Sequence, residues 1–255
     1  MSTPTSQPLA EGAYSGPPVV LAFATQKGGM GKTTLSVLVA SWLHYRRHIP
    51  VAILDVDSSQ LSVYNLRVRE TEQLDEETKE RFNRQDVDPY PILRGEPAGV
   101  PQMLQQIPAD VRLVLIDLPG NIDVEGYETA LSKVDYLLVP METSEFSVTT
   151  GFSYLMAIRQ VDLLPVDRCR VVWNKYKDSR DGVLVDMLEE RFKQFGFTCL
   201  QSRIPQRDSY QDSANRSTLF PMPTQYLRNS GLKDLFTEIE SLLPVSTLST
   251  PVEND

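Results

Sequence analysis

The sequence predicts an α/β fold in which a doubly wound, mostly parallel sheet is flanked by helices. Short apolar runs recur along the chain, helical patterns separate them, and a glycine-rich segment joins the first run to the first helix. Runs that are apolar throughout are typical of parallel strands buried on both faces. In such a sheet ligands bind at the carboxyl ends of the strands, so we expect the functional residues there.

The first strand and the first helix enclose a glycine loop. Residues 19–24 are all apolar, and after the glycines a largely apolar helical pattern continues as far as Arg46 and Arg47. Strand, glycine loop and helix together form a frame in which backbone N–H groups point at a phosphate over the helix N-terminus.

The later strands follow in order, each separated from the next by a helical or charged stretch. We expect them at residues 51–54 (ending in Asp55), 90–93, 111–116 (ending in Asp117), 136–139, 170–173 and 198–200. Pro91 favours an edge position for residues 90–93. The last helix, expected at about residues 231–243, has apolar residues on one side and acidic residues on the other. Acidic residues disfavour binding to anionic lipid, so this helix is expected to pack on the sheet.

Three segments differ from this alternation. Residues 69–88 are strongly charged, which indicates an exposed helix or an insertion. Residues 1–18 are rich in Ser, Thr, Pro and Gly and are expected to be disordered, and residues 244–255 are expected to form a flexible tail. Residues 19–243 would then form one domain, which is long enough for a single large core.

Composition restricts the choice of partners and compartment. The formal net charge of −9 gives no global attraction to nucleic acid or anionic lipid, so DNA binding would need a local basic patch. The two cysteines, Cys169 and Cys199, lack metal-ligand spacing and are expected to be buried thiols in a reducing cytoplasm. No signal peptide and no apolar run of membrane-spanning length is seen. His44 and His48 are four residues apart, but no carboxylate or cysteine accompanies them, so we expect no metal there.

The glycine loop, residues 27–34, reads K-G-G-M-G-K-T-T. Its glycines permit positive φ and let the backbone come close to a ligand. Lys32 is the expected cation for the β- and γ-phosphates, and Thr33 is the expected hydroxyl ligand of Mg²⁺. The residues expected to bind nucleotide in this loop are Gly28, Gly29, Met30, Gly31, Lys32, Thr33 and Thr34.

The loop carries a second lysine, Lys27, and Gln26 stands where the common pattern G-x-x-x-x-G-K-[ST] begins with glycine. This string resembles the deviant Walker A motif of the ParA/MinD group of P-loop ATPases. In that family the additional lysine reaches across a dimer interface to the phosphates of the other subunit's nucleotide. The resemblance implies that Lys32 serves its own subunit's ATP and that Lys27 serves the partner's, which couples ATP binding to homodimerisation.

Carboxylates follow two of the expected strands. Asp55-Val56-Asp57-Ser58-Ser59-Gln60 resembles the family pattern D-x-D-P-Q, but the proline is missing and glutamine comes one place later. The resemblance implies that Asp57 orients the hydrolytic water and that Asp55 supports Mg²⁺ or its waters. Residues 113–116 and Asp117 resemble a Walker B strand, whose carboxylate engages the Mg²⁺ shell.

Base recognition rests on two later segments. An amide at Asn174 can donate to and accept from an adenine edge. The resemblance implies that Asn174 contacts the base and that Pro205 packs on its ring. The guanine pattern N-K-x-D is absent because Lys177 stands where the acid belongs. The Asn174-Lys175 pair still makes GTP worth testing.

The ParA branch of the family binds DNA without sequence preference through basic residues. The candidates here are Arg203, Arg207, Arg216, Arg228 and Lys233. A patch of this kind would neutralise phosphates, and its binding would fall with salt. The alternative is an ordinary solvated surface. Residues 215–221, N-R-S-T-L-F-P, resemble ParA-like proteins of conjugative elements.

The family resemblance implies a cytoplasmic ATPase that uses ATP and Mg²⁺. Its dimerisation and hydrolysis would switch the binding of DNA or of a ParB-like stimulating protein, for positioning a plasmid, chromosome or conjugative element, with no membrane partner. An alternative is a nucleotide-dependent scaffold with little hydrolysis, because the Asp57 loop departs from the pattern. An electron-transfer reductase of the nitrogenase type is a third reading, but Cys169 and Cys199 lack the positions to bridge a cluster.

Overall fold

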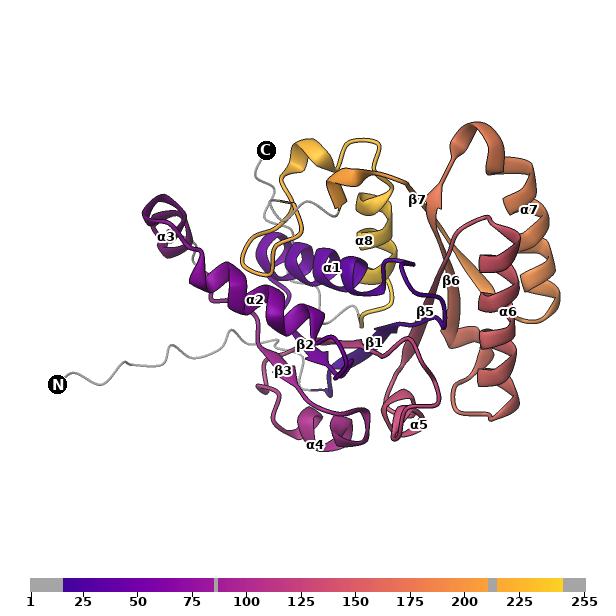
Figure 1. The fold of residues 1–255 in the computed structure, drawn as a ribbon, viewed down its shortest axis with the longest axis horizontal. Coiled ribbons are helices and arrows are strands. Elements are labelled where there is room, and N and C mark those ends of the chain that lie inside the picture. Colours follow the sequence, from indigo (N-terminus) through magenta and orange to yellow (C-terminus); the bar gives the residue numbers. More distant parts are fainter. Residues whose placement is uncertain (1–15, 85–86, 211–214, 245–255) are drawn as a thin grey trace.

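The computed structural model describes residues 16–84, 87–210 and 215–244. The expected disordered segment 1–18 and the expected tail 244–255 lie outside these residues, except at their inner ends. The strands within them are β1 (Val19–Phe23), β2 (Val51–Asp55), β3 (Ile92–Arg94), β4 (Leu113–Asp117), β5 (Tyr136–Met141), β6 (Cys169–Tyr176) and β7 (Thr198–Pro205). They form one sheet in the order β3-β2-β4-β1-β5-β6-β7, and every adjacent pair is parallel (Figure 1).

Helices connect these strands. They are α1 (Lys32–Arg47), α2 (Ser62–Glu72), α3 (Glu76–Asn83), α4 (Val100–Gln105), α5 (Tyr127–Leu131), α6 (Glu145–Gln160), α7 (Asp178–Gln194) and α8 (Leu232–Glu240). Short 3₁₀ turns occur at Pro97–Gly99, Val166–Arg168, Asp208–Tyr210 and Thr224–Tyr226. The predicted fold class is confirmed, with a sheet that is parallel throughout the described strands.

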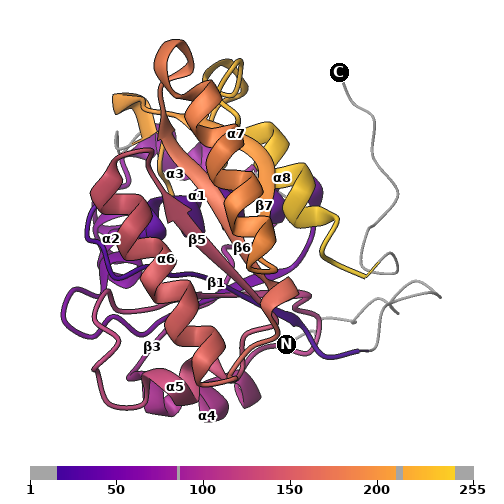
Figure 2. The same ribbon diagram turned by 90° about the vertical axis from the view of Figure 1, so that its right-hand side faces the viewer.

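The helices form two layers, one on each face of the sheet. Helices α1, α2 and α8 pack on one face, and α4 to α7 pack on the other. Figure 2 shows α6 and α7 side by side in front of β5 and β6. Successive residues of β1 face opposite layers: Leu21 joins the first core and Ala22 the second, and both are fully buried. Burial on both faces explains why this strand is apolar throughout.

The last helix packs on the sheet as expected. Leu235 and Phe236 are buried, and the Phe236 ring stacks on Trp42 of α1 at 5.3 Å between centroids. On its polar side, the Glu238 carboxylate accepts hydrogen bonds from the backbone N–H groups of Gln201 and Ser202 at the β7 edge. One of the acidic residues on the polar side of this helix therefore binds the backbone of β7. Within the described ranges, no helix combines the length and apolarity needed to cross a bilayer.

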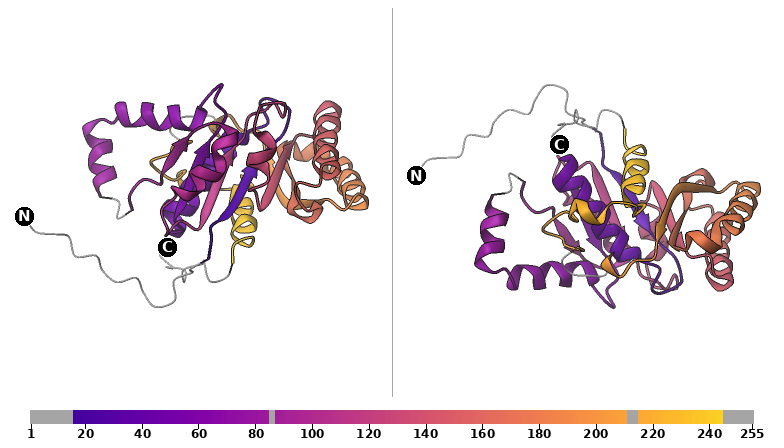
Figure 3. Two further views of the ribbon diagram at one scale, coloured as in Figure 1. Left: turned by 90° about the horizontal axis from the view of Figure 1, so that it is seen from below. Right: turned by 90° about the horizontal axis from the view of Figure 1, so that it is seen from above.

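Residues 69–83 of the charged segment belong to an arm made of α2 and α3, residues 62–83. Figure 3 shows these two helices meeting at an angle, with α3 away from the sheet. No residue of α3 is buried, and its start is capped by Asp75, whose side chain accepts from the Thr78 N–H at 2.7 Å. The prediction of an exposed helix is confirmed for α3.

The strand order places the candidate site at a topological switch point. β1 pairs with β4 on one side and with β5 on the other. The connection from β1 runs through α1 to β2 on the first side, and the connection from β4 crosses to β5 on the second. Asp55 and Asp117 lie opposite each other at the carboxyl ends of β2 and β4, and Phe23 at the end of β1 is also in register with Asp117. The acidic strand ends and the glycine loop therefore share one edge, where doubly wound sheets bind ligands.

The cysteines are free thiols, as predicted. Cys169 is buried and Cys199 is partly buried. Burial raises the pKa of each thiol to about 12, so both stay protonated and unreactive at neutral pH.

Candidate functional site

The glycine loop leaves β1 and turns into α1, whose first residue is Lys32. Two of its glycines, Gly29 (φ 74°) and Gly31 (φ 87°), have left-handed backbone conformations. A Cβ at Gly31 would also lie 2.7 Å from Nδ2 of Asn174. Both the conformation and this contact require glycine at position 31.

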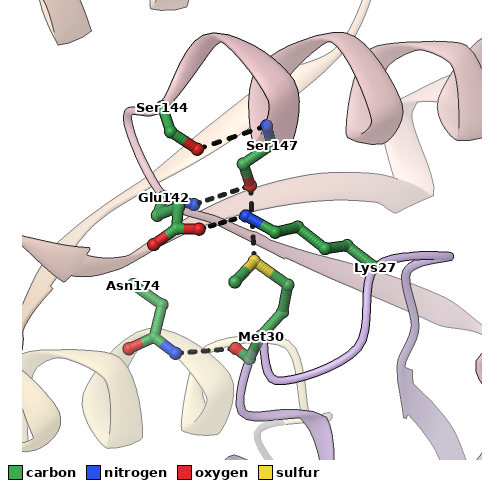
Figure 4. Close-up of polar contacts among 6 residues, drawn as sticks. All are labelled: Lys27, Met30, Glu142, Ser144, Ser147 and Asn174. Carbon is green, nitrogen blue, oxygen red and sulfur yellow. Dashed lines mark hydrogen bonds and ion pairs between the residues drawn. The ribbon is translucent and has the colours of Figure 1, made fainter.

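Side chains from strand β6 and helix α6 contact the loop (Figure 4). Nδ2 of Asn174 donates to the Met30 carbonyl at 2.7 Å, and Oγ of Ser147 donates to the Met30 sulfur at 3.3 Å. Oδ1 of Asn174 accepts from the Lys175 N–H at 3.0 Å. The amide predicted to contact adenine thus binds the backbone of the glycine loop, while its contact with a base stays a prediction.

The glycine loop opens onto a cavity of about 320 Å³. Its lining includes all of Gly28, Gly29, Met30, Gly31, Lys32, Thr33 and Thr34, together with Asp57, Gly120, Asn174, Pro205, Arg207 and Arg216. The residues expected to bind the nucleotide therefore surround one cavity. Lys27, Asp55 and Asp117 are not among its lining residues.

Lys32 supplies a cation to this cavity. Its ammonium lies 3.4 Å from the Thr25 carbonyl, a long contact for a hydrogen bond. Burial lowers the pKa of Lys32, and the charges of Asp117 and Asp57 partly offset that effect. A Cβ at Gly120 would lie 3.4 Å from the Lys32 nitrogen, so the chain passes close to it there. A desolvated ammonium without a strong acceptor is suited to bind an anion.

Behind Lys32, a hydroxyl and a carboxylate are joined. Oγ1 of Thr33 donates to Oδ2 of Asp117 at 2.8 Å, while Oδ1 of Asp117 is buried and has no hydrogen-bond partner among the described residues. Burial raises the pKa of Asp117 to about 7, against the opposing effect of the Thr33 hydrogen bond. Oxygen donors of this kind suit Mg²⁺.

The metal-binding capacity of the protein alone is limited. The described residues contain no group of three or more His, Cys, Asp or Glu side chains that could hold a metal ion. A hydroxyl and one carboxylate fit Mg²⁺ that takes its remaining ligands from phosphates and water. Of the two histidines considered in the sequence, His44 has its Nε2 bound to the Asp88 carbonyl at 2.7 Å.

The two aspartates after β2 have different surroundings. Oδ2 of Asp55 accepts from the backbone N–H groups of Val63 and Tyr64, both at 2.9 Å, and so caps the start of α2. Asp57 lines the cavity, and its Oδ1 accepts from Oγ of Ser59 at 2.6 Å. The loop without the family proline therefore still directs Asp57 to the cavity. Metal support by Asp55 stays a prediction.

Lys27 is not among the residues that line this cavity. Its side chain extends toward Glu142 and the start of α6 (Figure 4). Its ammonium forms an ion pair with Glu142 and lies 5.4 Å from the centre of the Phe146 ring. The hydrogen bond from Lys27 lowers the pKa of Glu142. Both charged side chains are only partly exposed. The contact with a partner's nucleotide stays a prediction.

A comparison with protein families matches residues 21–220 to the CobQ/CobB/MinD/ParA nucleotide binding domain. The chain belongs to this family. The match covers the glycine loop, the carboxyl ends of β2 and β4, and most of the cavity. The resemblance stated from the sequence is thereby confirmed at the level of the family.

Solved structures share the fold. A putative plasmid partition protein from Borrelia burgdorferi, bound to AMPPNP, superposes with a TM-score of 0.65 at 19% identity, covering 89% of this chain and 100% of that chain. The MinC:MinD cell division complex of Aquifex aeolicus gives 0.64 at 15% identity, covering 92% and 99%. A ParA family ATPase from Chlorobium tepidum gives 0.59 at 20% identity, covering 88% and 99%. A search of curated proteins finds no match.

The basic residues predicted to bind DNA have unlike surroundings in this ParA/MinD-family chain. Arg207 and Arg216 line the cavity. Arg203 is paired with Asp186 at 3.0 Å and with Glu189 at 3.5 Å, both on α7. The remaining candidates, Arg228 and Lys233, are exposed. DNA binding by these five residues stays a prediction. The two carboxylates beside Arg203 offset its positive charge, whereas Arg228 and Lys233 are exposed to solvent.

Sequence reasoning missed Glu142 and Ser147, which contact Lys27 and Met30 of the glycine loop. Glu142 follows β5 directly, just as Asp55 and Asp117 end β2 and β4. The same rule of acids at strand ends would have singled it out. Ser147 has no comparable signal, since a serine in the first turn of a helix is commonplace.

Proposed function

We propose that the protein is a ParA-like ATPase that binds Mg·ATP in the cavity beside the glycine loop. In this proposal ATP binding joins two copies of the chain, and hydrolysis separates them. The observation that supports it most is the cavity itself, which is lined by residues 28–34 of the glycine loop, including Lys32 with its partly desolvated ammonium.

The loop and α1 supply the phosphate contacts in this proposal. Backbone N–H groups at the start of α1 and the ammonium of Lys32 bind the β- and γ-phosphates. Thr33 and Asp117 would hold Mg²⁺, which when bound offsets the negative charge of the phosphates. Asp57, which faces the cavity, orients the attacking water.

The output of the switch is the binding of DNA or of a partner protein. Structures with this fold include a putative plasmid partition protein, which supports a DNA cargo, and a MinC:MinD cell division complex, which supports a protein partner. In this proposal the ATP-bound dimer binds DNA without sequence preference, and a ParB-like protein stimulates hydrolysis. The dimer works in the cytoplasm on the nucleoid, for a plasmid, chromosome or conjugative element.

A nucleotide-dependent scaffold with little hydrolysis is the second candidate. It is favoured by the Asp57 loop, where Ser58 and Ser59 replace the family proline and glutamine, and where Ser59 already occupies Oδ1 of Asp57. A carboxylate engaged in this way is less available to a water molecule.

Turnover and binding together distinguish these functions. ATP and GTP binding and hydrolysis are measured with and without Mg²⁺ and DNA, for the wild type and for Lys32→Ala. The ATPase proposal expects Mg²⁺-dependent ATP turnover that Lys32→Ala abolishes together with ATP binding. ATP binding and dimerisation without turnover in any condition would support the scaffold. A wild type that binds no nucleotide contradicts both, and an unchanged ATP affinity in Lys32→Ala contradicts the loop assignment.

A further inference from the structure

Residues 215–221 pack against α1, although the two segments are far apart in the sequence. Oγ of Ser41 donates to the Ser217 carbonyl at 2.6 Å, and the Tyr45 hydroxyl donates to the Thr218 carbonyl at 2.8 Å. Both carbonyls are buried with their α1 partners. These contacts hold the backbone of the segment beside the helix that begins in the glycine loop.

The α2–α3 arm binds the same segment from the other side. Nε of Arg67 donates to Oγ1 of Thr218 at 2.7 Å, and its Nη2 donates to the Thr218 carbonyl at 2.9 Å. The Glu70 carboxylate accepts from the Thr218 N–H at 2.9 Å and from its hydroxyl. Thr218 is fully buried, so its polar groups are satisfied by two charged residues of α2.

The tip of the arm adds contacts to Phe220. The guanidinium of Arg81 lies 4.3 Å from the centre of the Phe220 ring, and the Phe82 ring meets it edge-on at 6.2 Å. The charged arm, whose role the sequence left open, therefore contacts Thr218 through α2 and Phe220 through α3.

Arg216 lies near the start of segment 215–221, two residues before Thr218, and lines the cavity beside the glycine loop. Its Nη1 lies 3.4 Å from Oγ1 of Thr34, in the first turn of α1. Its Nε is buried and has no hydrogen-bond partner in the described part of the chain. A buried donor without an acceptor is unfavourable unless a ligand supplies one.

The second arginine of the cavity differs in this respect. Nη1 of Arg207 donates to the Arg228 carbonyl at 3.2 Å, and its Nη2 donates to the Asn229 carbonyl. These bonds tie Arg207 to the loop before α8. Arg216 is thus the cavity arginine with a buried Nε that has no acceptor among the described residues, and its Nη1 makes only a long contact with Thr34.

We propose that Arg216 is a nucleotide-binding residue whose guanidinium binds a phosphate oxygen of the nucleotide, and that the α2–α3 arm holds it there through Thr218. This inference rests on the proposed function, since it takes the cavity to be the nucleotide site. Its position beside Thr34 puts the guanidinium near the α1 N-terminus, where the helix dipole also favours an anion. A guanidinium matches phosphate oxygens with paired N–H donors.

The test measures ADP affinity by calorimetry for the wild type, Arg216→Ala, Arg216→Lys and the control Arg69→Ala. Arg69 is exposed on the same arm. Loss of a charged hydrogen bond should weaken ADP binding by about tenfold or more in Arg216→Ala. Arg216→Lys keeps the charge but not the paired N–H donors of the guanidinium, so its ADP affinity should lie between those of the wild type and Arg216→Ala. Arg69→Ala should bind ADP as the wild type does. If Arg216→Ala does not fold, Arg216→Lys carries the test.

The arm is tested in the same assay by Glu70→Gln, with the exposed Glu72→Gln as its control. Glu70→Gln should weaken ADP binding in the direction of Arg216→Ala, and Glu72→Gln should not. Unchanged ADP affinity in both Arg216 variants overturns the proposal, and so does a loss of DNA binding at constant ADP affinity. A wild type that binds no ADP instead refutes the proposed function.

Discussion

Lys27 in the glycine loop is paired with Glu142 of its own chain, at the carboxyl end of β5. The pair joins residues 115 positions apart and is partly shielded from solvent. If Lys27 serves a partner's nucleotide, this pair must open when the dimer forms. The intramolecular pair and the intermolecular contact then compete for one ammonium, and each can be altered separately.

Removing the ammonium should separate nucleotide binding from dimerisation. Because Lys27 does not line the cavity, Lys27→Ala should retain ATP binding yet lose ATP-induced dimerisation. Light scattering with and without ATP measures the dimer, and calorimetry measures the ATP affinity. A normal dimer in Lys27→Ala would exclude the cross-subunit role.

Removing the carboxylate should have the opposite effect. Glu142→Gln frees Lys27 from an ion pair, and partly exposed pairs of this kind contribute up to about 1 kcal/mol. The ATP concentration that half-saturates dimerisation should therefore fall by about two- to fivefold. Glu128→Gln on α5, which removes one exposed carboxylate elsewhere, controls for net charge. A weaker dimer in Glu142→Gln would mean that Glu142 positions Lys27 rather than restrains it.

The strand ends were predictable from the sequence, but the long-range contacts were not. Apolar runs that end in Asp55 and Asp117 predict parallel strands with acids at one edge, because both features are local. The contact of Arg216 with Thr34 and the hydrogen bond from the Thr218 N–H to Glu70 join segments more than a hundred residues apart in the sequence. Local periodicity carries no information about such pairs. The sequence therefore groups Arg216 with Arg228 as candidate DNA ligands, and DNA binding by either residue stays a prediction.

His44 should make stability depend on pH. Burial lowers its pKa below the usual 6.5, since the ring is packed between Tyr45 and Tyr90 with Nδ1 buried and without a partner among the described residues. The carbonyls of Asp88 and Ile49 raise the pKa, but Arg67 and His48 lower it further. The unfolded chain therefore takes up the proton first as pH falls below about 6.5, and the free energy of unfolding decreases until the pH reaches the lower pKa of folded His44.

Denaturant unfolding at pH values from about 7.5 to about 5.5 measures this effect. His44→Gln cannot titrate, and its amide can still donate to the Asp88 carbonyl. Its stability relative to the wild type should rise as the pH falls through this window. The control His48→Asn leaves His44 intact and should keep most of the wild-type slope, because His48 is the smallest of the causes that act on the pKa of His44. Parallel curves for the wild type and His44→Gln would show that folded His44 titrates as it does in the unfolded chain.

Asp57 decides between the ATPase and the scaffold. It lines the cavity and is the candidate that orients water, but its Oδ1 is bound by the Ser59 hydroxyl. If Asp57 acts on water, Asp57→Ala should still bind ATP and should remain in the ATP-bound dimer, with turnover reduced by about a hundredfold or more. Ser59→Ala, which releases Oδ1, should keep or raise the turnover of the wild type. Phosphate release and light scattering on the same samples check both variants. Wild-type turnover in Asp57→Ala would show that another group orients the water, and the role carried over from the D-x-D-P-Q pattern would then not apply to this loop.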